Sequence, residues 1–550
     1  MLLSVAGAFA QVEVNGIYYN LLSESEAEVT AHPSSGYSGD IVIPSVISYD
    51  EEDYIVTTIG NYAFYPCPAL TSVTIPNSVT GIYTSNFFDC PALTSITVES
   101  GNPNYSSDDG VLLNQDQTAV FRCPEGKAGS YVMANSATRI YNSAFWGCSA
   151  LSSVTMPNSV TTIGGYAFSH CSALTSITLS NSITTIEERT FYGCSALASV
   201  IIPNSVDTIG DLAFYGCSAL TSIILGNSVA TLVKSAFAGC TALTSIEVES
   251  ENANYSSVDG VLSNKSKTTL LLCPQGKTSY TVPNSVTTIG EGAFSYCIKL
   301  TSIDISNSVT AIGSSAFSDC TALTSIDIPN SVTTIGSKAF SGCIALASID
   351  IPNGVSAIEK ETFAGCSALA SVTIPSSVKS IGEEYAFINC VALTSITVLN
   401  LVPIKISPTV FNLYFWDPTV DITAITLEVP TSAVPDYQAA EVWKEMIIVG
   451  GGMLVNPVPG DPKQGYTESD GLYNGRATTT VTAVPRNNYK FVSWTKDGVE
   501  VSRDNPYSFT VTEDVELVAN FLTSTVISPL PLFQCLPVSD LPAFLEVVAL

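Results

Sequence analysis

Residues 171–191 read CSALTSITLSNSITTIEERTF, and the spacing of apolar residues in this stretch returns across most of the chain. The next stretch, residues 194–214, starts again with Cys194 and places apolar residues at the same positions. The period is 23 residues. In the first stretch the apolar positions are Leu174, Ile177, Leu179, Ile183, Ile186 and Phe191. A fixed period of this length predicts a solenoid, in which similar turns stack on one another.

The motif Phe-x-x-Cys marks the end of each turn. A single turn cannot bury its own apolar face, so a continuous core forms only when neighbouring turns stack. The sequence contains twelve marked turns, at Phe64, Phe87, Phe145, Phe168, Phe191, Phe214, Phe237, Phe294, Phe317, Phe340, Phe363 and Phe387.

Each turn is expected to contain two short extended pieces. Residues 174–179, LTSITL, end with the alternation that is typical of a short strand, and a second extended piece is expected at residues 160–164, VTTIG. We expect one helical turn before Phe168 and a parallel sheet built from the stacked strands. Proline, which cannot continue a ladder, closes the first strand in several turns: Pro157, Pro203, Pro329, Pro352 and Pro375.

The full pattern, C-x-x-L-x-x-I-x-[IL]-P-N-S-V-T-x-I-G-x-x-A-F-x-x-C, resembles the BspA-like, or treponemal-type, leucine-rich repeat of bacterial surface proteins over residues 41–449. The resemblance implies an elongated, secreted or surface-attached protein that mediates adhesion by binding host or neighbouring-cell proteins. It brings no catalytic residues. The expected fold is therefore a mainly β repeat solenoid with 23-residue turns and a parallel sheet.

The N-terminal segments differ from the repeats. Residues 1–10, MLLSVAGAFA, are short and apolar, and their A-x-A-like end at Ala10 resembles a secretory signal peptide that is cleaved before Gln11. Residues 11–59 alternate as strands without the Phe-x-x-Cys motif, so we expect an N-terminal β cap that shields the first turn. The solenoid itself is assigned to residues 60–398.

The C-terminal part is expected to hold a cap, a small domain and a tail. Residues 399–449 resemble the family's C-terminal cap, in which Trp443 is a cap residue rather than a ligand platform. After a glycine hinge, residues 450–521 resemble a divergent internalin-B-type repeat, a small β-grasp-like domain. Residues 522–550 stay unassigned, because their apolar run is broken by prolines and is too short to span a membrane.

Two intervals break the period, with 58 residues between Phe87 and Phe145 and 57 between Phe237 and Phe294. Both contain the sequences Asn-x-Asn-Tyr-Ser-Ser, Asp-Gly-Val-Leu and Cys-Pro-x-Gly-Lys. We interpret each as a variant turn widened by a hairpin at residues 114–116 or 264–266. Acidic residues near Asp109 lack the spacing of a calcium-binding loop, so a structural turn is favoured.

Composition limits the classes of partner. The formal net charge is −29 with only 20 lysines and arginines, which argues against nucleic acid and anionic membranes as partners. His32 and His170 have no metal ligands at suitable spacing, so we expect no metal and no cofactor. We also expect a monomer. Most of the cysteines, 12 of 15, occupy one repeat position and are expected to be buried free thiols.

Function is expected to be binding rather than catalysis. The enzymatic rival is a polysaccharide-processing β-solenoid, which needs clustered carboxylates with an arginine or lysine in a cleft, and arginine is nearly absent from the repeats. A second alternative is a structural stalk that displays the C-terminal domain. The expected partner of a binding protein is a surface or matrix protein of the host or of bacteria.

One outward strand position carries the candidate site, because strand side chains alternate. Two interpretations remain open: a solvated face produced by repeat duplication, or a contact surface for a basic segment of a partner protein. In the second, an acidic row of Asp304, Asp327 and Asp350 adjoins Glu247 and an apolar patch of Ile201 and Ile224. In chain order the position holds Thr155, Thr178, Ile201, Ile224, Glu247, Asp304, Asp327, Asp350, Thr373 and Thr397.

Overall fold

The computed structural model describes residues 11–524 except residues 35, 84, 383, 412–419 and 475. The chain forms two compact units, Met1–Gly452 and Met453–Leu550. The expected signal peptide at residues 1–10 and all of the tail after residue 524 lie outside the described residues.

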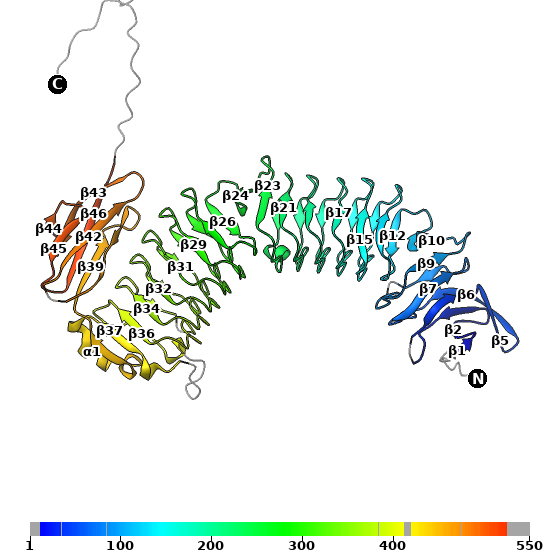
Figure 1. The fold of residues 1–550 in the computed structure, drawn as a ribbon, viewed down its shortest axis with the longest axis horizontal. Helices are drawn as coiled ribbons and strands as arrows, with labels where there is room; N and C mark the ends of the chain where they lie inside the picture. The colour runs from blue at the N-terminus through cyan, green and yellow to red at the C-terminus, as the bar shows by residue number, and fades with distance from the viewer. Residues whose placement is uncertain are drawn as a thin grey trace, which may run out of the picture. The chain divides into compact units, whose positions relative to one another are not determined.

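Two rows of parallel strands run through the first unit, as Figure 1 shows. In the turn quoted above, β17 (Ser176–Thr178) pairs with β15 (Leu151–Thr155) of the preceding turn, and β18 (Thr185–Ile186) pairs with β20 (Thr208–Ile209) of the following one. We call the two rows the A strands and the B strands. Both expected extended pieces and their parallel stacking are confirmed.

The remaining A strands are β4 (Ser38–Val42), β7 (Ala69–Ile75), β9 (Ser95–Val98), β13 (Gly129–Val132), β19 (Ser199–Ile201), β21 (Ser222–Leu225), β23 (Ser245–Val248), β27 (Ser279–Thr281), β29 (Ser302–Asp304), β32 (Ser348–Asp350), β34 (Ser371–Ile374), β36 (Ser395–Val398), β37 (Thr426–Val429) and β38 (Ile447–Gly450). The remaining B strands are β6 (Glu52–Ile59), β8 (Gly81–Ile82), β12 (Ala119–Arg122), β14 (Arg139–Ile140), β16 (Thr162–Ile163), β22 (Thr231–Leu232), β26 (Thr269–Leu272), β28 (Thr288–Ile289), β30 (Ala311–Ile312), β31 (Thr334–Ile335), β33 (Ala357–Ile358) and β35 (Ser380–Ile381).

A ladder of phenylalanine rings fills the core between the two rows. The rings of Phe145 and Phe168 stack with centroids 4.8 Å apart, and Phe168 stacks on Phe191 at 5.4 Å. Phe411, which lacks the following cysteine, extends the ladder beyond Phe387 at 5.9 Å. Stacking is interrupted only where a variant turn enters, since among the described residues every other marked phenylalanine faces the next one.

The repeated cysteines bond to the backbone of the neighbouring turn. All 14 cysteines that the structure describes are buried and free. The Cys171 thiol donates to the Phe145 carbonyl oxygen over 3.1 Å, and Cys194 bonds in the same way to Phe168. The expectation that these residues are small buried side chains is therefore confirmed, and each also supplies a hydrogen-bond donor.

Hydroxyl side chains also tie each turn to the one before it. Thr244 Oγ1 donates to the Thr221 carbonyl oxygen over 3.2 Å, and Thr301 donates to Thr278 over 3.0 Å. These bonds run alongside the backbone ladder, so Thr244 and Thr301 stabilise the stack as well as facing solvent.

The expected helical turn before the ladder phenylalanine is wrong. In the marked turns that the structure describes, this segment is a series of hydrogen-bonded turns, with one 3-10 helix, η1 (Lys234–Phe237), as the exception. The Phe168 amide donates to the Thr190 carbonyl of the next turn over 2.8 Å, so it is not available for a helical bond. In addition, Tyr166 has a φ of 59°, which a right-handed helix does not accept.

Each variant turn inserts a three-stranded antiparallel meander. In the first, β10 (Tyr105–Asp108), β11 (Val111–Asn114) and β12 pair in order, and β12 then joins the B row by parallel pairing with β14. The second repeats this with β24 (Tyr255–Val258), β25 (Val261–Asn264) and β26. The predicted hairpins are therefore confirmed. Buried Asn102 donates to two backbone carbonyls, which agrees with a structural turn.

Both ends of the first unit carry distinct segments. The N-terminal segment, formed by β1 (Gln11–Val14), β2 (Ile17–Leu21), β3 (Glu26–Val29), β5 (Val46–Tyr49) and β6, is a sheet in the order β1-β2-β3-β6-β5. The C-terminal segment contains η2 (Pro408–Val410), η3 (Ile422–Ala424), η4 (Thr431–Ala433), α1 (Val434–Ala439) and η5 (Trp443–Glu445). Trp443 is buried and its Nε1 donates to the Ile404 carbonyl over 2.6 Å, so it packs as part of this segment.

In the described residues of the second unit, β-strands are the only regular secondary structure. One sheet has the order β41-β39-β46-β43-β44 and the other the order β40-β42-β45, and the buried Trp494 lies in their common core. Their bounds are β39 (Met453–Pro459), β40 (Gly465–Glu468), β41 (Gly471–Tyr473), β42 (Thr478–Pro485), β43 (Tyr489–Lys496), β44 (Val499–Ser502), β45 (Tyr507–Thr510) and β46 (Val515–Thr523). Across the described parts of the chain, no helix has the length and apolar character needed to cross a bilayer.

Candidate interaction surface

The outward side of the A strands, which we call the A face, holds every residue of the candidate site. In β17 the Ile177 side chain is buried, whereas Ser176 and Thr178 point outward. Parallel register places Ser153 beside Ser176 and Thr155 beside Thr178. Outward residues of successive turns therefore form rows, as alternation predicts.

The structure places the predicted residues along one row, in two groups on either side of the second variant turn. Ile201 lies beside Ile224, and Ile224 lies beside Glu247. Asp304 forms an isolated bridge with Asp327. Asp350 pairs with Thr373 of the next turn, and its own turn stacks on that of Asp327 through the bond from the Ala347 amide to the Thr324 carbonyl.

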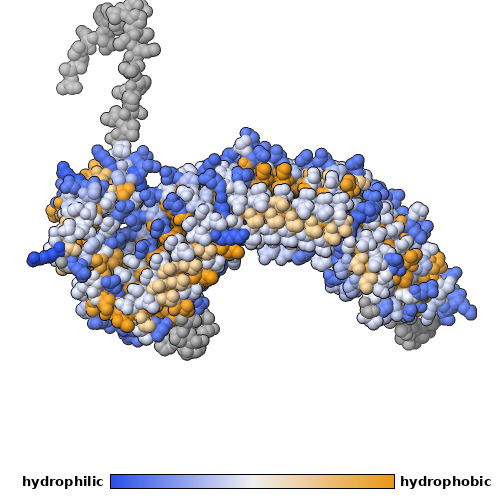
Figure 2. Space-filling view, viewed as in Figure 1, coloured by the Kyte–Doolittle hydropathy of each residue, from blue (hydrophilic) through white to orange (hydrophobic). Residues whose placement is uncertain are grey.

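The apolar patch is exposed. Ile201 has 71% of its surface exposed and Ile224 has 37%. Val132, which the sequence reasoning missed, lies in the same row beside Thr155 and is 65% exposed. Figure 2 shows apolar side chains gathered over the strands between β17 and β23. Such a patch on a surface otherwise rich in hydroxyl groups marks a candidate contact.

The acidic residues are exposed and lack basic partners. Asp304, Asp327 and Asp350 all face solvent. Within the described residues, no lysine or arginine forms an ion pair with any of them. At the far end of the row, Glu428 continues the acidic character and accepts a bond from Thr397.

A hollow of about 430 Å³ opens on the A face at the second variant turn. Asp259, Lys277, Tyr280 and Asp304 line it. It lies where β23 and β27 do not pair, because the meander enters the stack between them. The hollow therefore joins the start of the acidic row to an ammonium group and a second carboxylate.

In the first variant turn the equivalent lysine forms an ion pair with the aspartate of the Asp-Gly sequence. Lys127, the counterpart of Lys277, donates to the Asp109 carbonyl oxygen over 2.6 Å and to its carboxylate over 2.8 Å. Its side chain is only 9% exposed. The Asp-Gly and Cys-Pro-x-Gly-Lys sequences shared by the two variant turns mark Asp109 with Lys127 and Asp259 with Lys277, but they do not reveal that the first two form an ion pair.

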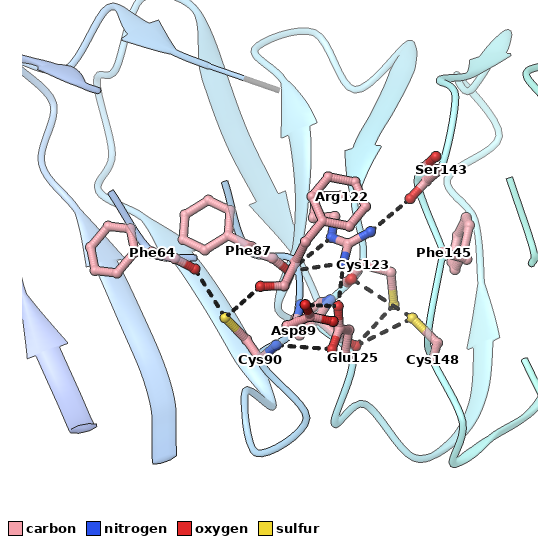
Figure 3. A network of polar contacts seen from close by, with 12 residues as sticks. Phe64, Phe87, Asp89, Cys90, Arg122, Cys123, Glu125, Ser143, Phe145 and Cys148 are labelled. Carbon is pink, nitrogen blue, oxygen red and sulfur yellow. Dashed lines mark hydrogen bonds and ion pairs between the residues drawn. The ribbon is translucent and has the colours of Figure 1, made fainter. Parts of the chain in front are cut away.

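A buried ion pair braces the first variant turn (Figure 3). Arg122 Nη2 lies 2.7 Å from Glu125 Oε1, and both side chains are 5% exposed. Arg122 also donates to the carbonyl oxygens of Phe87 and Ser143.

Glu125 in turn accepts the amides of Asp89 and Cys90, each over 2.9 Å. Burial raises the pKa of Glu125, while Arg122 and the two amides act in the opposite direction. The guanidinium of Arg122 and the carboxylate of Glu125 therefore bind backbone carbonyls and amides at the place where the regular stack is interrupted. In the second variant turn Leu272 and Gln275 stand at these positions, and Gln275 accepts the Gly239 amide over 2.9 Å.

Metal ligation finds no support in the part of the chain that is described, where no group of three or more His, Cys, Asp or Glu side chains could hold an ion. His32 lies between the rings of Tyr18 and Tyr37. His170 is exposed and lies between the rings of Trp146 and Tyr192.

The repeats and the second unit each match a known family model. A family model of the BspA type leucine rich repeat region matches residues 50–109, 131–258 and 275–412 in six copies. A model of the divergent InlB B-repeat domain matches residues 461–525. No curated protein matches the chain.

Several solved structures are similar to the chain. A leucine rich cell surface protein from Faecalibacterium prausnitzii is 30% identical over 72% of this chain and 96% of its own, with a TM-score of 0.43. The pneumococcal vaccine antigen PcpA is 22% identical over 80% of this chain and 98% of its own, with a TM-score of 0.41. A leucine-rich repeat protein from Eubacterium ventriosum is 22% identical over 80% and 96%, with a TM-score of 0.43.

Proposed function

The chain belongs to the BspA-type leucine-rich repeat family, and from this premise we propose that it is a secreted or cell-surface bacterial protein that binds other proteins without catalysis. The observation that carries the proposal is the A face, where an exposed acidic row without basic partners follows an exposed apolar patch. Rows of outward side chains on stacked turns are the kind of surface that repeat proteins use to bind partners.

The chemistry of the row favours a basic partner segment. Neighbouring aspartates such as Asp304 and Asp327 repel each other by about 1 kcal/mol in a high dielectric. A lysine- or arginine-containing segment relieves this repulsion when it binds, and the net charge of −29 steers such a segment toward the protein. Ile201 and Ile224 supply the apolar contact that charged rows lack.

The non-catalytic part of the proposal has its own support. Arg122 and Glu125, which resemble a catalytic pair in composition, are buried and bonded to backbone groups. The hollow beside Asp304 contains carboxylates and a lysine, but its place in the row agrees better with recognition of a charged segment than with bond cleavage.

The test uses the full chain as bait for host and bacterial surface proteins, followed by affinity measurement with the captured partner. Asp304→Thr, Asp327→Thr and Asp350→Thr combined should weaken binding, and the loss should shrink as salt is raised. The same variant should melt slightly higher, because the mutual repulsion is removed.

A matched control removes the same charge outside the A strands, with Glu251→Thr, Glu291→Thr and Glu441→Thr, three exposed residues. Equal weakening by both triple variants would indicate only a general charge effect. Unchanged affinity in the aspartate variant would move the site to the variant turns or to the second unit.

A further inference from the structure

A row of partly or fully exposed aromatic rings follows a different edge of the first unit, formed by residues one or two positions after the ladder phenylalanines. Phe88 and Trp146 have ring centroids 5.4 Å apart, and Tyr192 stacks on Tyr215 at 4.8 Å. His170 joins the two pairs, at 6.0 Å from Trp146 and 5.2 Å from Tyr192. We call these five residues the aromatic row.

The repeat does not require aromatic residues here. The position directly after the ladder phenylalanine is Trp146, Tyr192 or Tyr215 in the early turns, yet the fold is unchanged where later turns carry small residues. Those later residues are Ala238, Ser295, Ser318, Ser341 and Ala364, and the last marked turn carries Ile388. The turns therefore stack without aromatic rings at this position. The change from aromatic to small residues at one repeat position is the signal that could have been found in the sequence.

An open hollow of about 460 Å³ lies along the row. It is lined by Trp146, Tyr166, His170, Arg189, Tyr192 and Tyr215. Ser169 takes the place of an aromatic residue in the middle turn and also lines the hollow. A small side chain between two rings leaves the space, and the surrounding rings, imidazole and hydroxyl groups form its walls.

The charge on the wall is already compensated. Arg189 Nη1 lies 3.1 Å from the Glu188 carboxylate and also donates to the Tyr166 hydroxyl. Its guanidinium lies over the Tyr166 ring, 5.2 Å from the centroid. The Arg189 guanidinium repels a cationic ligand. Glu188 and the net charge of −29 on the protein repel an anionic ligand. Charge therefore favours a neutral ligand.

We propose that the hollow and the aromatic row bind a neutral oligosaccharide. A pyranose ring has an apolar C–H face that packs on aromatic rings, and its hydroxyl groups pair with tyrosine, imidazole and guanidinium groups such as those of Tyr166, His170 and Arg189. Because the rings continue from turn to turn, the site suits a chain of sugars lying along the row rather than a single sugar. This site is separate from the A face and does not depend on the proposed protein partner.

The test is calorimetric titration of the full chain with cello-, chito- and manno-oligosaccharides. At least one should bind with a saturable isotherm, and raising the salt concentration should not change the affinity, because the ligand is neutral. Trp146→Ser combined with Tyr192→Ser should weaken binding by at least about tenfold. Serine occupies the same position in the turns of Phe317 and Phe340, so the variant should keep the wild-type melting temperature within a few degrees.

The matched control is Tyr296→Ser, which removes a tyrosine that is 58% exposed in a turn outside the row. It should leave binding unchanged, and so should the triple aspartate variant of the A face. Absence of saturable binding to all three sugars, or an equal loss with Tyr296→Ser, would overturn the proposal. Salt-sensitive binding of oligolysine or polyphosphate that competes at the row would also overturn it, in favour of a charged ligand.

Discussion

Ile326 and Thr324 belong to one turn and face opposite ways, as the repeat pattern predicts: Ile326 is 5% exposed and Thr324 faces solvent. Ile326→Asp places an unpaired charge in the core and should lower the free energy of unfolding by about 3 to 5 kcal/mol. Thr324→Asp should change it by no more than about 0.5 kcal/mol. Thermal melting followed by circular dichroism compares the two, and similar shifts would show that the faces are assigned the wrong way round.

Arg122 and Glu125 allow a prediction with a pH dependence. Arg122→Leu leaves Glu125 buried without its cation, which should cost about 3 to 5 kcal/mol at neutral pH. Burial already raises the pKa of Glu125 above its ordinary value of 4.5, and loss of Arg122 raises it further. The folded variant therefore binds this proton more tightly than the unfolded chain, so its stability falls as the pH rises from 4.5 through the raised pKa.

The measurement is urea unfolding of wild type and Arg122→Leu at several pH values. The difference between them should shrink as the pH is lowered toward 4.5. The control is Arg122→Leu with Glu125→Gln, which reproduces the Leu272 and Gln275 of the second variant turn and should be less destabilised at neutral pH. If the loss in free energy of unfolding caused by Arg122→Leu did not change with pH, the buried charge of Glu125 would not be its cause.

Sequence alone predicts which residues point inward, because each inward position is repeated in many turns. It does not predict Arg122 with Glu125, since each occurs once and its partners are backbone groups about 35 residues away. In the sequence, His170 is notable only as a histidine without metal ligands at suitable spacing. Its place between Trp146 and Tyr192 becomes visible only when the turns are stacked in register.

Among structural elements, the cysteine ladder gives the next prediction. Burial raises the pKa of Cys343 and Cys390 to about 12, and each thiol donates to a carbonyl oxygen. Because the thiolate is the reactive form, native protein should react very slowly with a thiol reagent. In denaturant without reductant, at least 14 of the chain's 15 cysteines should react, namely those that the structure describes. A count well below 14 would reveal disulfide bonds.

The strands and the helical turn show where pattern reasoning succeeds and fails at this scale. The A and B strands are predicted because alternation reports which side chains are buried. The sequence predicts a helical segment before Phe168, but the amides of Tyr166 and Phe168 bond to the following turn. Hydrogen bonds between turns are invisible in the sequence of one repeat, although they decide the backbone conformation there.

For the whole molecule, nearest-neighbour stacking predicts which deletions are tolerated. Removal of residues 320–342, one period, joins Asp319 to Cys343 and keeps the Phe317-x-x-Cys spacing. This variant should fold cooperatively with a melting temperature only a few degrees lower. Removal of residues 331–342 breaks the spacing and should abolish cooperative unfolding. Circular dichroism and melting of both variants provide the check, and comparable behaviour would contradict the stacking model.

The hydroxyl bonds between turns have an evolutionary consequence. The Thr221 carbonyl accepts a bond from the Thr244 hydroxyl of the following turn, and the Thr221 hydroxyl donates to the Ala198 carbonyl of the preceding turn. An in-frame duplication of one repeat therefore produces a copy whose hydroxyl donors and carbonyl acceptors already fit those of the neighbouring turns. Selection on the outward residues can then act without disturbing these bonds, so a lineage can change its ligands quickly while its scaffold stays the same.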